Sequence, residues 1–235
     1  FYAKFWEFLK EREAEGHFNR PLEELVSFVD TNEEAVAIMV EYKKKYPAFC
    51  PLPISTDIQK LDNALRRIKD LGPTIGIFGP EKPGTGKLNE VFKDVAKIFT
   101  GRGINIVCRG AKAGADDIRQ AFEEAKNSIG KASTKLIELW VGEESFAFKE
   151  TMDALPLVFS YWFEQKVIAL RACKNGYIFR AGGPGTLDIL TDVLCDKQTG
   201  KIKNVPIVLL GRKEWRLLLE WFKEVLLKEG MISSE

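Results

Sequence analysis

The feature that most constrains the fold is a regular alternation of short apolar runs with amphipathic helical segments, which begins near residue 74. Runs of the first kind have the length and composition of buried strands, and the segments between them place apolar side chains on one helical face. Strands separated by helices pair in parallel through right-handed crossovers, with helices on both faces of the sheet. The sequence therefore predicts an α/β protein with a Rossmann-like, doubly wound parallel sheet. We predict strands at residues 74–78, 104–108, 136–141, 176–179 and 205–210, and helices at residues 88–99, 118–125, 159–172, 187–194 and 215–226.

The first third of the chain contains helical spacing without a strand pattern. The last of its helices carries Leu61, Ala64, Leu65 and Ile68 on one face, and a proline-containing connection at residues 47–55 precedes it. Thr56 or Asp57 is available to cap that helix. We predict a helical N-terminal extension at residues 1–70 and a Rossmann-like domain at residues 71–235, with the boundary near Leu71-Gly72-Pro73.

Charge and hydropathy exclude two classes of partner. The 235 residues include 35 Lys and Arg against 34 Asp and Glu, so the formal net charge is +1. Affinity for a nucleic-acid backbone needs many unpaired cations, so we expect no nucleic-acid partner. No apolar stretch approaches the roughly 20 residues that cross a bilayer, and residues 1–9 lack the pattern of a signal peptide. We expect a cytoplasmic protein with no membrane partner.

The cysteines argue against a metal site or a disulfide framework. Cys50, Cys108, Cys173 and Cys195 are widely spaced and form no C-x-x-C pair, and His17 is the one histidine. We expect four reduced, buried thiols, no metal and no cofactor. His17 lies in the helical extension, so we interpret it as incidental.

The strongest motif is Gly182-Gly183-Pro184-Gly185-Thr186, which follows a predicted strand and opens a predicted helix. Glycines allow backbone N–H groups to approach an anion closely, and the helix N-terminus adds partial positive charge. Thr186 can cap the helix or donate its hydroxyl to a phosphate. We favour phosphate binding over a plain strand-to-helix turn.

A second glycine-bearing loop, at residues 79–87, is similar to a P-loop but lacks two of its residues. Glu81 stands where the first glycine is needed, and Leu88 stands where Ser or Thr follows the lysine. We therefore interpret it as a solvated loop rather than an ATP cradle. Gly79 is still placed to approach a ligand, because ligands bind beyond the carboxyl ends of parallel strands.

These residues resemble the Lonely-Guy phosphoribohydrolases, a family also labelled lysine decarboxylase-like, whose signature is P-G-G-x-G-T-x-x-E. The resemblance spans residues 74–221 and is closest at residues 181–188, with further similarity at residues 198–202 and 206–209. It implies a Rossmann-like fold, a homodimer, and hydrolysis of the N-glycosidic bond of nucleoside 5'-monophosphates. It also implies that the glycines and Thr186 hold the 5'-phosphate.

The chain departs from this signature at the residues that carry catalysis. The signature glutamate falls at Ile189, and the family's catalytic arginine falls at Lys166. Breaking a ribosyl C–N bond builds positive charge on the sugar, so a carboxylate must stabilise it or activate water. Asp188 and Asp192 are the nearby carboxylates that could replace the glutamate, and an ordinary solvated or capping role is the competing interpretation for both.

Several further side chains are candidates for the ligand site, each with ordinary surface charge or a packing role as the alternative. The second loop, at residues 109–116, resembles the family's earlier glycine-rich loop, and cations flank the main motif. The aromatic cluster at residues 159–163 is more typical of a core or a dimer interface than of a base-stacking platform. The candidate phosphate- or nucleotide-binding residues are Gly79, Arg109, Gly110, Gly114, Arg171, Gly182, Gly183, Gly185 and Thr186; Lys112 and Arg180 are further cations near these loops.

Three functions follow from these observations. The leading hypothesis is a protein that binds a nucleoside 5'-monophosphate or another small phosphate and has lost or altered hydrolysis. The second is an active phosphoribohydrolase that uses Lys166 with Asp188 or Asp192. The third is a dimeric interaction scaffold in which the helical extension binds a partner.

Overall fold

The computed structural model describes residues 2–45, 58–80, 87–110, 114–129, 133–142, 153–202 and 205–232. Six strands form one sheet in which every pairing is parallel. The predicted Rossmann-like α/β fold is thereby confirmed. The strands are β1 (Thr74–Phe78), β2 (Asn105–Arg109), β3 (Leu136–Val141), β4 (Ala154–Phe159), β5 (Tyr177–Arg180) and β6 (Ile207–Leu210).

The strand order, β4-β3-β2-β1-β5-β6, reverses direction at one place in the sheet. The chain moves outward from β1 to β4, and then returns to place β5 and β6 on the other side of β1. Gly76 of β1 is in register with Val107 of β2 on one side and with Tyr177 of β5 on the other. The gap beyond the carboxyl ends of β1 and β5 is therefore the switch point at which such sheets bind ligands.

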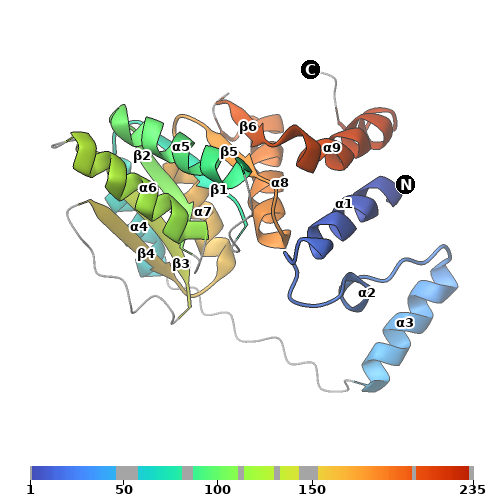
Figure 1. The fold of residues 1–235 in the computed structure, drawn as a ribbon. Coiled ribbons are helices and arrows are strands. Elements are labelled where there is room, and N and C mark those ends of the chain that lie inside the picture. Colours follow the sequence, from blue (N-terminus) through green and yellow to red (C-terminus); the bar gives the residue numbers. More distant parts are fainter. Residues whose placement is uncertain are drawn as a thin grey trace.

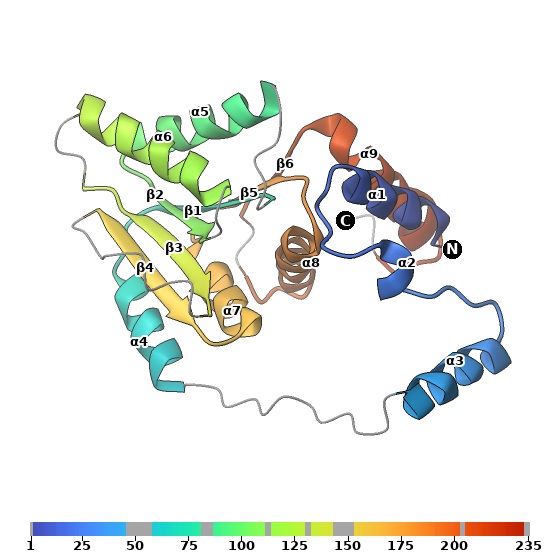
Figure 2. The same cartoon turned by 60° about the horizontal axis from the view of Figure 1, so that its bottom comes forward.

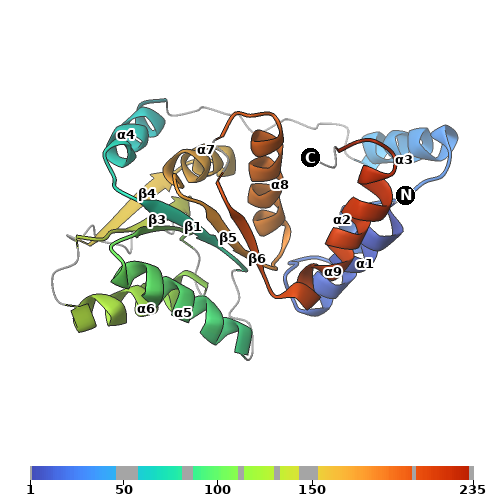
Figure 3. The same ribbon diagram turned by 90° about the horizontal axis from the view of Figure 1, so that it is seen from above.

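Helices cover both faces of this sheet (Figures 1 and 3). On one face lie α5 (Lys87–Gly101) and α6 (Gly114–Ile129); on the other lie α4 (Ile58–Lys69), α7 (Trp162–Ala172) and α8 (Pro184–Gln198). Beyond β6, α1 (Ala3–Ala14) packs beside α9 (Arg212–Trp221), which continues as the π-helical segment η2 (Phe222–Leu227). The one-turn helix α2 (Leu22–Leu25) follows α1.

Two apolar clusters, one on each face, hold the layers together. The first contains Phe92 and Ala96 of α5 with Ile77 of β1, all at most 3% exposed. The second contains Ile168 of α7 and Ile189 of α8, and extends to α1 and α4. Burial of this apolar surface is the main force that stabilises the layered arrangement.

The helices of the predicted N-terminal extension lie in three different places. Helix α4 buries Ala64 and Ile68 in the second cluster and thus covers the sheet beside α7. Helix α1 buries Phe8, whose ring stacks on Trp215 of α9 with centroids 6.1 Å apart. Helix α3 (Asn32–Lys45) buries no residue and stands apart from the sheet (Figure 2). The division at residue 70 stays a prediction, but residues on both sides of it share one core.

One strand was not predicted, and one helix was predicted too long as a result. The sequence predicts a helix from residue 159, whereas β4 occupies Ala154–Phe159 and α7 begins at Trp162. Pro156 lies within β4, and proline removes a ladder donor, which weakens any strand pattern. It is tolerated because β4 lies at the edge of the sheet and, within the described residues, pairs with β3 alone, where Pro156 is opposite Glu138.

The thiols are only partly as predicted. Cys108 and Cys173 are buried, and burial raises the pKa of both thiols well above the ordinary value. Cys195 is exposed on α8, so the prediction of a buried side chain is wrong there. Cys50, the connection at residues 47–55, the caps Thr56 and Asp57, residues 81–86 and Lys112 lie outside the described residues. None of the helices in the described ranges is long and apolar enough to span a membrane.

Candidate functional site

The glycine motif lies at the switch point of the sheet, directly after β5. Gly183 is the N-cap of α8 with extended backbone angles (φ −76°, ψ −169°), and Pro184 occupies the first helical turn, where its missing N–H costs nothing. Gly182 allows a close approach of two loops: a Cβ there would lie 2.6 Å from Thr186 Oγ1 and 3.0 Å from the Pro80 nitrogen. The motif thus packs directly against the chain that leaves β1.

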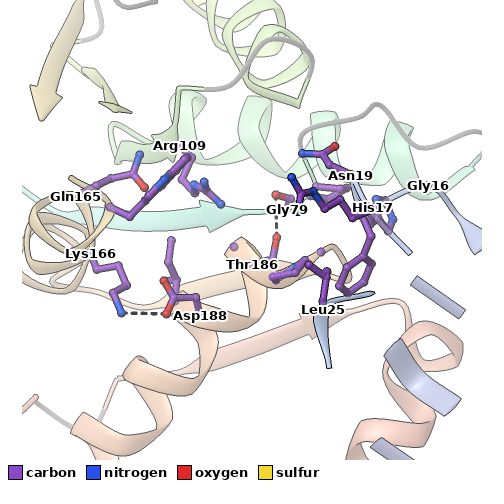
Figure 4. A pocket seen from close by; sticks show the side chains of 18 residues that line it. Gly16, His17, Asn19, Leu25, Gly79, Arg109, Gln165, Lys166, Thr186 and Asp188 are labelled. Atoms are coloured by element: carbon purple, nitrogen blue, oxygen red, sulfur yellow. Dashed lines mark hydrogen bonds and ion pairs between the residues drawn. The ribbon is translucent and has the colours of Figure 1, made fainter. Parts of the chain in front are cut away.

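Thr186 joins these two loops instead of capping α8. Its side chain is 2% exposed, and its hydroxyl donates a hydrogen bond to the Gly79 carbonyl at 3.0 Å. Figure 4 shows this bond at the floor of a cleft. Thr186 therefore fixes the distance between the carboxyl end of β1 and the first turn of α8, and the predicted cap is not formed.

The cleft above this floor has a volume of about 770 Å³, which is within the range of small-molecule sites. Its described lining comes from five parts of the chain: the end of β1, the end of β2, the beginning of α7, the beginning of α8, and residues 16–20 with Leu25. The Lys166–Asp188 pair lies at one end of the cleft, His17 and Asn19 lie at the other, and Thr186 lies between them (Figure 4).

Arg109, at the end of β2, places its guanidinium next to the glycine turn. A Cβ at Gly185 would lie only 2.2 Å from Arg109 Nη1, so the glycine creates the space that the guanidinium uses. The guanidinium carbon lies 4.4 Å from the centre of the Trp162 ring, a cation–π contact that holds it in place. A positive charge is thereby positioned beside the N-terminus of α8, where an anion is already favoured.

Lys166 of α7 lies between two carboxylates of α8. Its Nζ is 2.9 Å from Asp188 Oδ1 and 2.8 Å from Asp192 Oδ2. The hydrogen bond to Asp192, followed by the bond to Asp188, raises the pKa of Lys166. The three charges sum to −1, so this end of the cleft does not attract a phosphate.

Ile189 lies where the family's glutamate is expected. It is 1% exposed, belongs to the second apolar cluster, and contributes to the cleft wall. An aliphatic side chain neither stabilises a developing positive charge nor activates water. Asp188 also lines the cleft, with its side chain 46% exposed. It is the carboxylate of the described lining that could stabilise such a charge or activate water.

Four predicted site residues are not among the described residues that line the cleft: Gly110, Arg171, Gly182 and Asp192. Gly110 has a packing reason to be glycine, since a Cβ would lie 2.1 Å from the Trp140 ring. Arg171 is exposed in the last turn of α7, whereas the cleft meets the first turn. Gly114 begins α6.

Residues 16–20 and Gln165 form part of the site without having been predicted. His17, interpreted above as incidental, lines the cleft, and its carbonyl contacts the glycine turn. Gln165 is 1% exposed, and its amide donates a hydrogen bond to the Leu139 carbonyl at 2.6 Å, which fixes α7 against β3. No local pattern marks residues 16–20, because a contact across more than 160 positions leaves no periodic signal.

Comparison with known proteins agrees with this geometry at the level of the family. No curated protein shows a significant match to the chain. The model of the family described as "Possible lysine decarboxylase" matches residues 118–235, a region that contains α7, the glycine motif and the whole of α8. Since this match covers half of the chain, the protein belongs to the possible lysine decarboxylase family, to which the Lonely-Guy resemblance pointed.

Proposed function

We propose that this protein binds a nucleoside 5'-monophosphate, with its phosphate on the glycine turn, and that it lacks the family-type hydrolytic carboxylate. The observation that carries the proposal is the placement of Arg109 against Gly185 at the N-terminus of α8, inside a cleft of about 770 Å³. The half-buried backbone of Gly183 and Gly185, the N-terminus of α8 and the Arg109 guanidinium are together suited to bind a phosphate.

The position of Ile189 supports the proposal that the family-type hydrolytic carboxylate is lacking. This side chain takes the place of the signature glutamate on the cleft wall. The loss of a positioned acid–base group lowers a rate by about 10²- to 10⁴-fold. We therefore expect binding without appreciable release of the base.

Titration calorimetry with AMP and other nucleoside monophosphates tests binding. We expect wild-type protein to bind AMP and Arg109→Ala to bind it at least about 10-fold more weakly, the usual loss for a charged hydrogen bond. Arg66→Ala is the matched control, because Arg66 is an exposed cation on α4 whose side chain is 75% exposed. No heat of binding at millimolar AMP would refute the proposal.

An active phosphoribohydrolase is the second candidate, and the position of Asp188 favours it. Asp188 lines the cleft beside Lys166, whereas Asp192 binds Lys166 from outside the described lining. If this candidate is correct, wild-type protein releases ribose 5-phosphate from AMP, Asp188→Asn abolishes the release, and Asp192→Asn retains more of it. A wild-type protein that binds AMP and leaves it intact removes this candidate.

An interaction scaffold is the third candidate, and α3 is the observation that favours it. This helix buries no residue and exposes Val36 and Met39 at 62% and 69%. Light scattering on wild-type protein and Met39→Glu tests whether α3 joins two copies. Equal molecular masses for the two proteins would remove α3 from any such interface.

A further inference from the structure

Residues 16–20, which we call the strap, pass directly over the glycine turn. A Cβ at Gly183 would lie 2.4 Å from the His17 carbonyl oxygen and 3.4 Å from its carbonyl carbon. The nearest of these atoms belongs to the backbone, and the His17 Cβ at 3.3 Å is fixed by it, so the contact does not depend on a side-chain rotamer. The strap and the first turn of α8 are therefore two packed surfaces of one site.

The strap is held in this position from both of its ends. On the α1 side, Glu15 Oε2 contacts Arg12 Nη1 at 2.9 Å and His17 Nε2 at 3.1 Å. On the α2 side, the Leu22 backbone N–H donates to Glu13 Oε1 at 2.7 Å, and Leu22 is 1% exposed. The strap is thus pre-ordered, which lowers the entropy cost of using it to bind a ligand.

The charges of the cleft lining favour the strap end as the anion end. Among the described residues of the lining, Arg20, Arg109 and Lys166 are cations and Asp188 is the carboxylate. Lys166 is paired with Asp188 and Asp192, so its charge is already compensated. Arg20 is exposed and makes no ion pair within the part of the chain that the structure describes.

Asn19 adds a neutral donor beside this cation. Asn19 lines the cleft and lies, with His17, at the end opposite Lys166 in the view of Figure 4. A phosphate on the glycine turn would present its outer oxygens to this end, since Arg109 already faces Gly185 from the β2 side. An amide and a guanidinium are suited to those oxygens.

We propose that the strap is the outer wall of the phosphate subsite and that Arg20 and Asn19 bind the outer phosphate oxygens of the ligand. The N-terminal helical residues are then part of the binding site and not an accessory to it. This inference rests on the proposed function, because it assigns the ligand's phosphate to the glycine turn.

The test compares AMP with ribose 5-phosphate, which keeps the phosphate and lacks the base. We expect Arg20→Ala to weaken the binding of both ligands by about 10-fold, and Asn19→Ala to weaken both by a smaller factor. Both side chains are exposed, so the variants should fold, and their melting temperatures check this. Lys10→Ala on α1 is the matched control, since Lys10 is exposed and pairs with Glu23 away from the cleft.

The outcomes separate this inference from the proposed function. Wild-type affinity for AMP in Arg20→Ala and Asn19→Ala, together with a loss in Arg109→Ala, overturns the strap assignment and leaves the proposed function standing. A loss for AMP but not for ribose 5-phosphate assigns the strap to the base and also overturns the inference. A wild-type protein that binds neither ligand refutes both.

Discussion

At the residue scale, the absence of a side chain at Gly183 is what allows the strap to reach the site. We predict that Gly183→Ala destabilises the protein by about 1–3 kcal/mol, the usual cost of overpacking. The added Cβ would meet backbone atoms of His17, which cannot rotate away as a flexible side chain can. The free energy of unfolding in urea measures this effect.

Gly72→Ala is the control for that prediction. A Cβ at Gly72 has its nearest neighbour, Asn105 Nδ2, at 4.0 Å, so the change should stay within about 0.5 kcal/mol. If the two alanine variants are equally stable, the contact between the strap and the turn is not a close one.

Ile189 is the second such residue, because its side chain stands where the family's catalytic glutamate is expected. We predict that Ile189→Glu raises the rate of base release from AMP by about 10²-fold or more, because it returns a carboxylate to the cleft wall. An assay for ribose 5-phosphate measures the rate. Ile189→Gln has the same shape without the charge and should remain inactive; a Glu variant that binds AMP with no faster release would contradict the prediction.

At the element scale, a part-buried ion pair joins α6 to β3. Glu138 of β3 is 1% exposed and accepts a hydrogen bond from Arg119 Nε at 3.0 Å. Burial raises the pKa of Glu138, and the Arg119 charge opposes that rise. Arg119 thus compensates the negative charge of a carboxylate that the sheet buries away from water.

We predict that Arg119→Met lowers the free energy of unfolding by about 3 kcal/mol, because it leaves Glu138 buried without its partner. Arg66→Met removes an arginine from the exposed pair with Asp62 and should cost less than about 1 kcal/mol. Urea denaturation of both variants gives the comparison. Similar losses in the two proteins would show that burial of Glu138 carries no penalty.

The elements also show what local sequence patterns can and cannot predict. The limits of β1 and β3 coincide with the predicted runs, because both strands are buried along almost their whole length and read as continuous apolar segments. Strand β4 was missed because Pro156 interrupts its pattern, and only its place at the sheet edge makes that proline acceptable. Spacing identified α4 as a helix, but spacing alone does not say which surface a helix covers.

At the scale of the whole molecule, the site combines parts that the sequence separates widely. The glycine motif, Gly79 and Arg109 were predictable, because parallel topology brings the carboxyl ends of neighbouring strands together. The position of the strap was not predictable, since its contact with α8 depends on the packing of α1 beside α9. Motifs therefore indicated that these residues lie near one another at the cleft, but they did not indicate that residues 16–20 also line it.

The strap also gives the folded molecule a dependence on pH. Burial lowers the pKa of His17 below its usual value of 6.5; Glu15 opposes this shift, and Arg12 and Arg180 add to it. The unfolded chain then binds a proton more readily than the folded one, so stability is lost as pH falls below 6.5 toward the lowered pKa. His17→Gln does not titrate and should remove this part of the dependence.

Urea denaturation of wild-type protein and His17→Gln between about pH 7 and pH 5 tests the prediction. We expect the wild type to lose stability relative to the variant as the pH falls. A difference that stays constant over this range would show that the strap buries His17 less than the structure indicates.

The packing of α1 on α9 has a consequence for the order of events during synthesis. Lys4 of α1 donates to Glu220 of α9 across 216 positions, and Phe8 stacks on Trp215 in the same interface. Contacts this distant in sequence form late, because the intervening chain must first be made and ordered. As the protein leaves the ribosome, we expect β1 to β5 and the glycine turn to assemble before α9 emerges, at a stage when α1 still lacks the helix on which it packs. We therefore expect residues 16–20 to take their place along the cleft only once α9 has emerged.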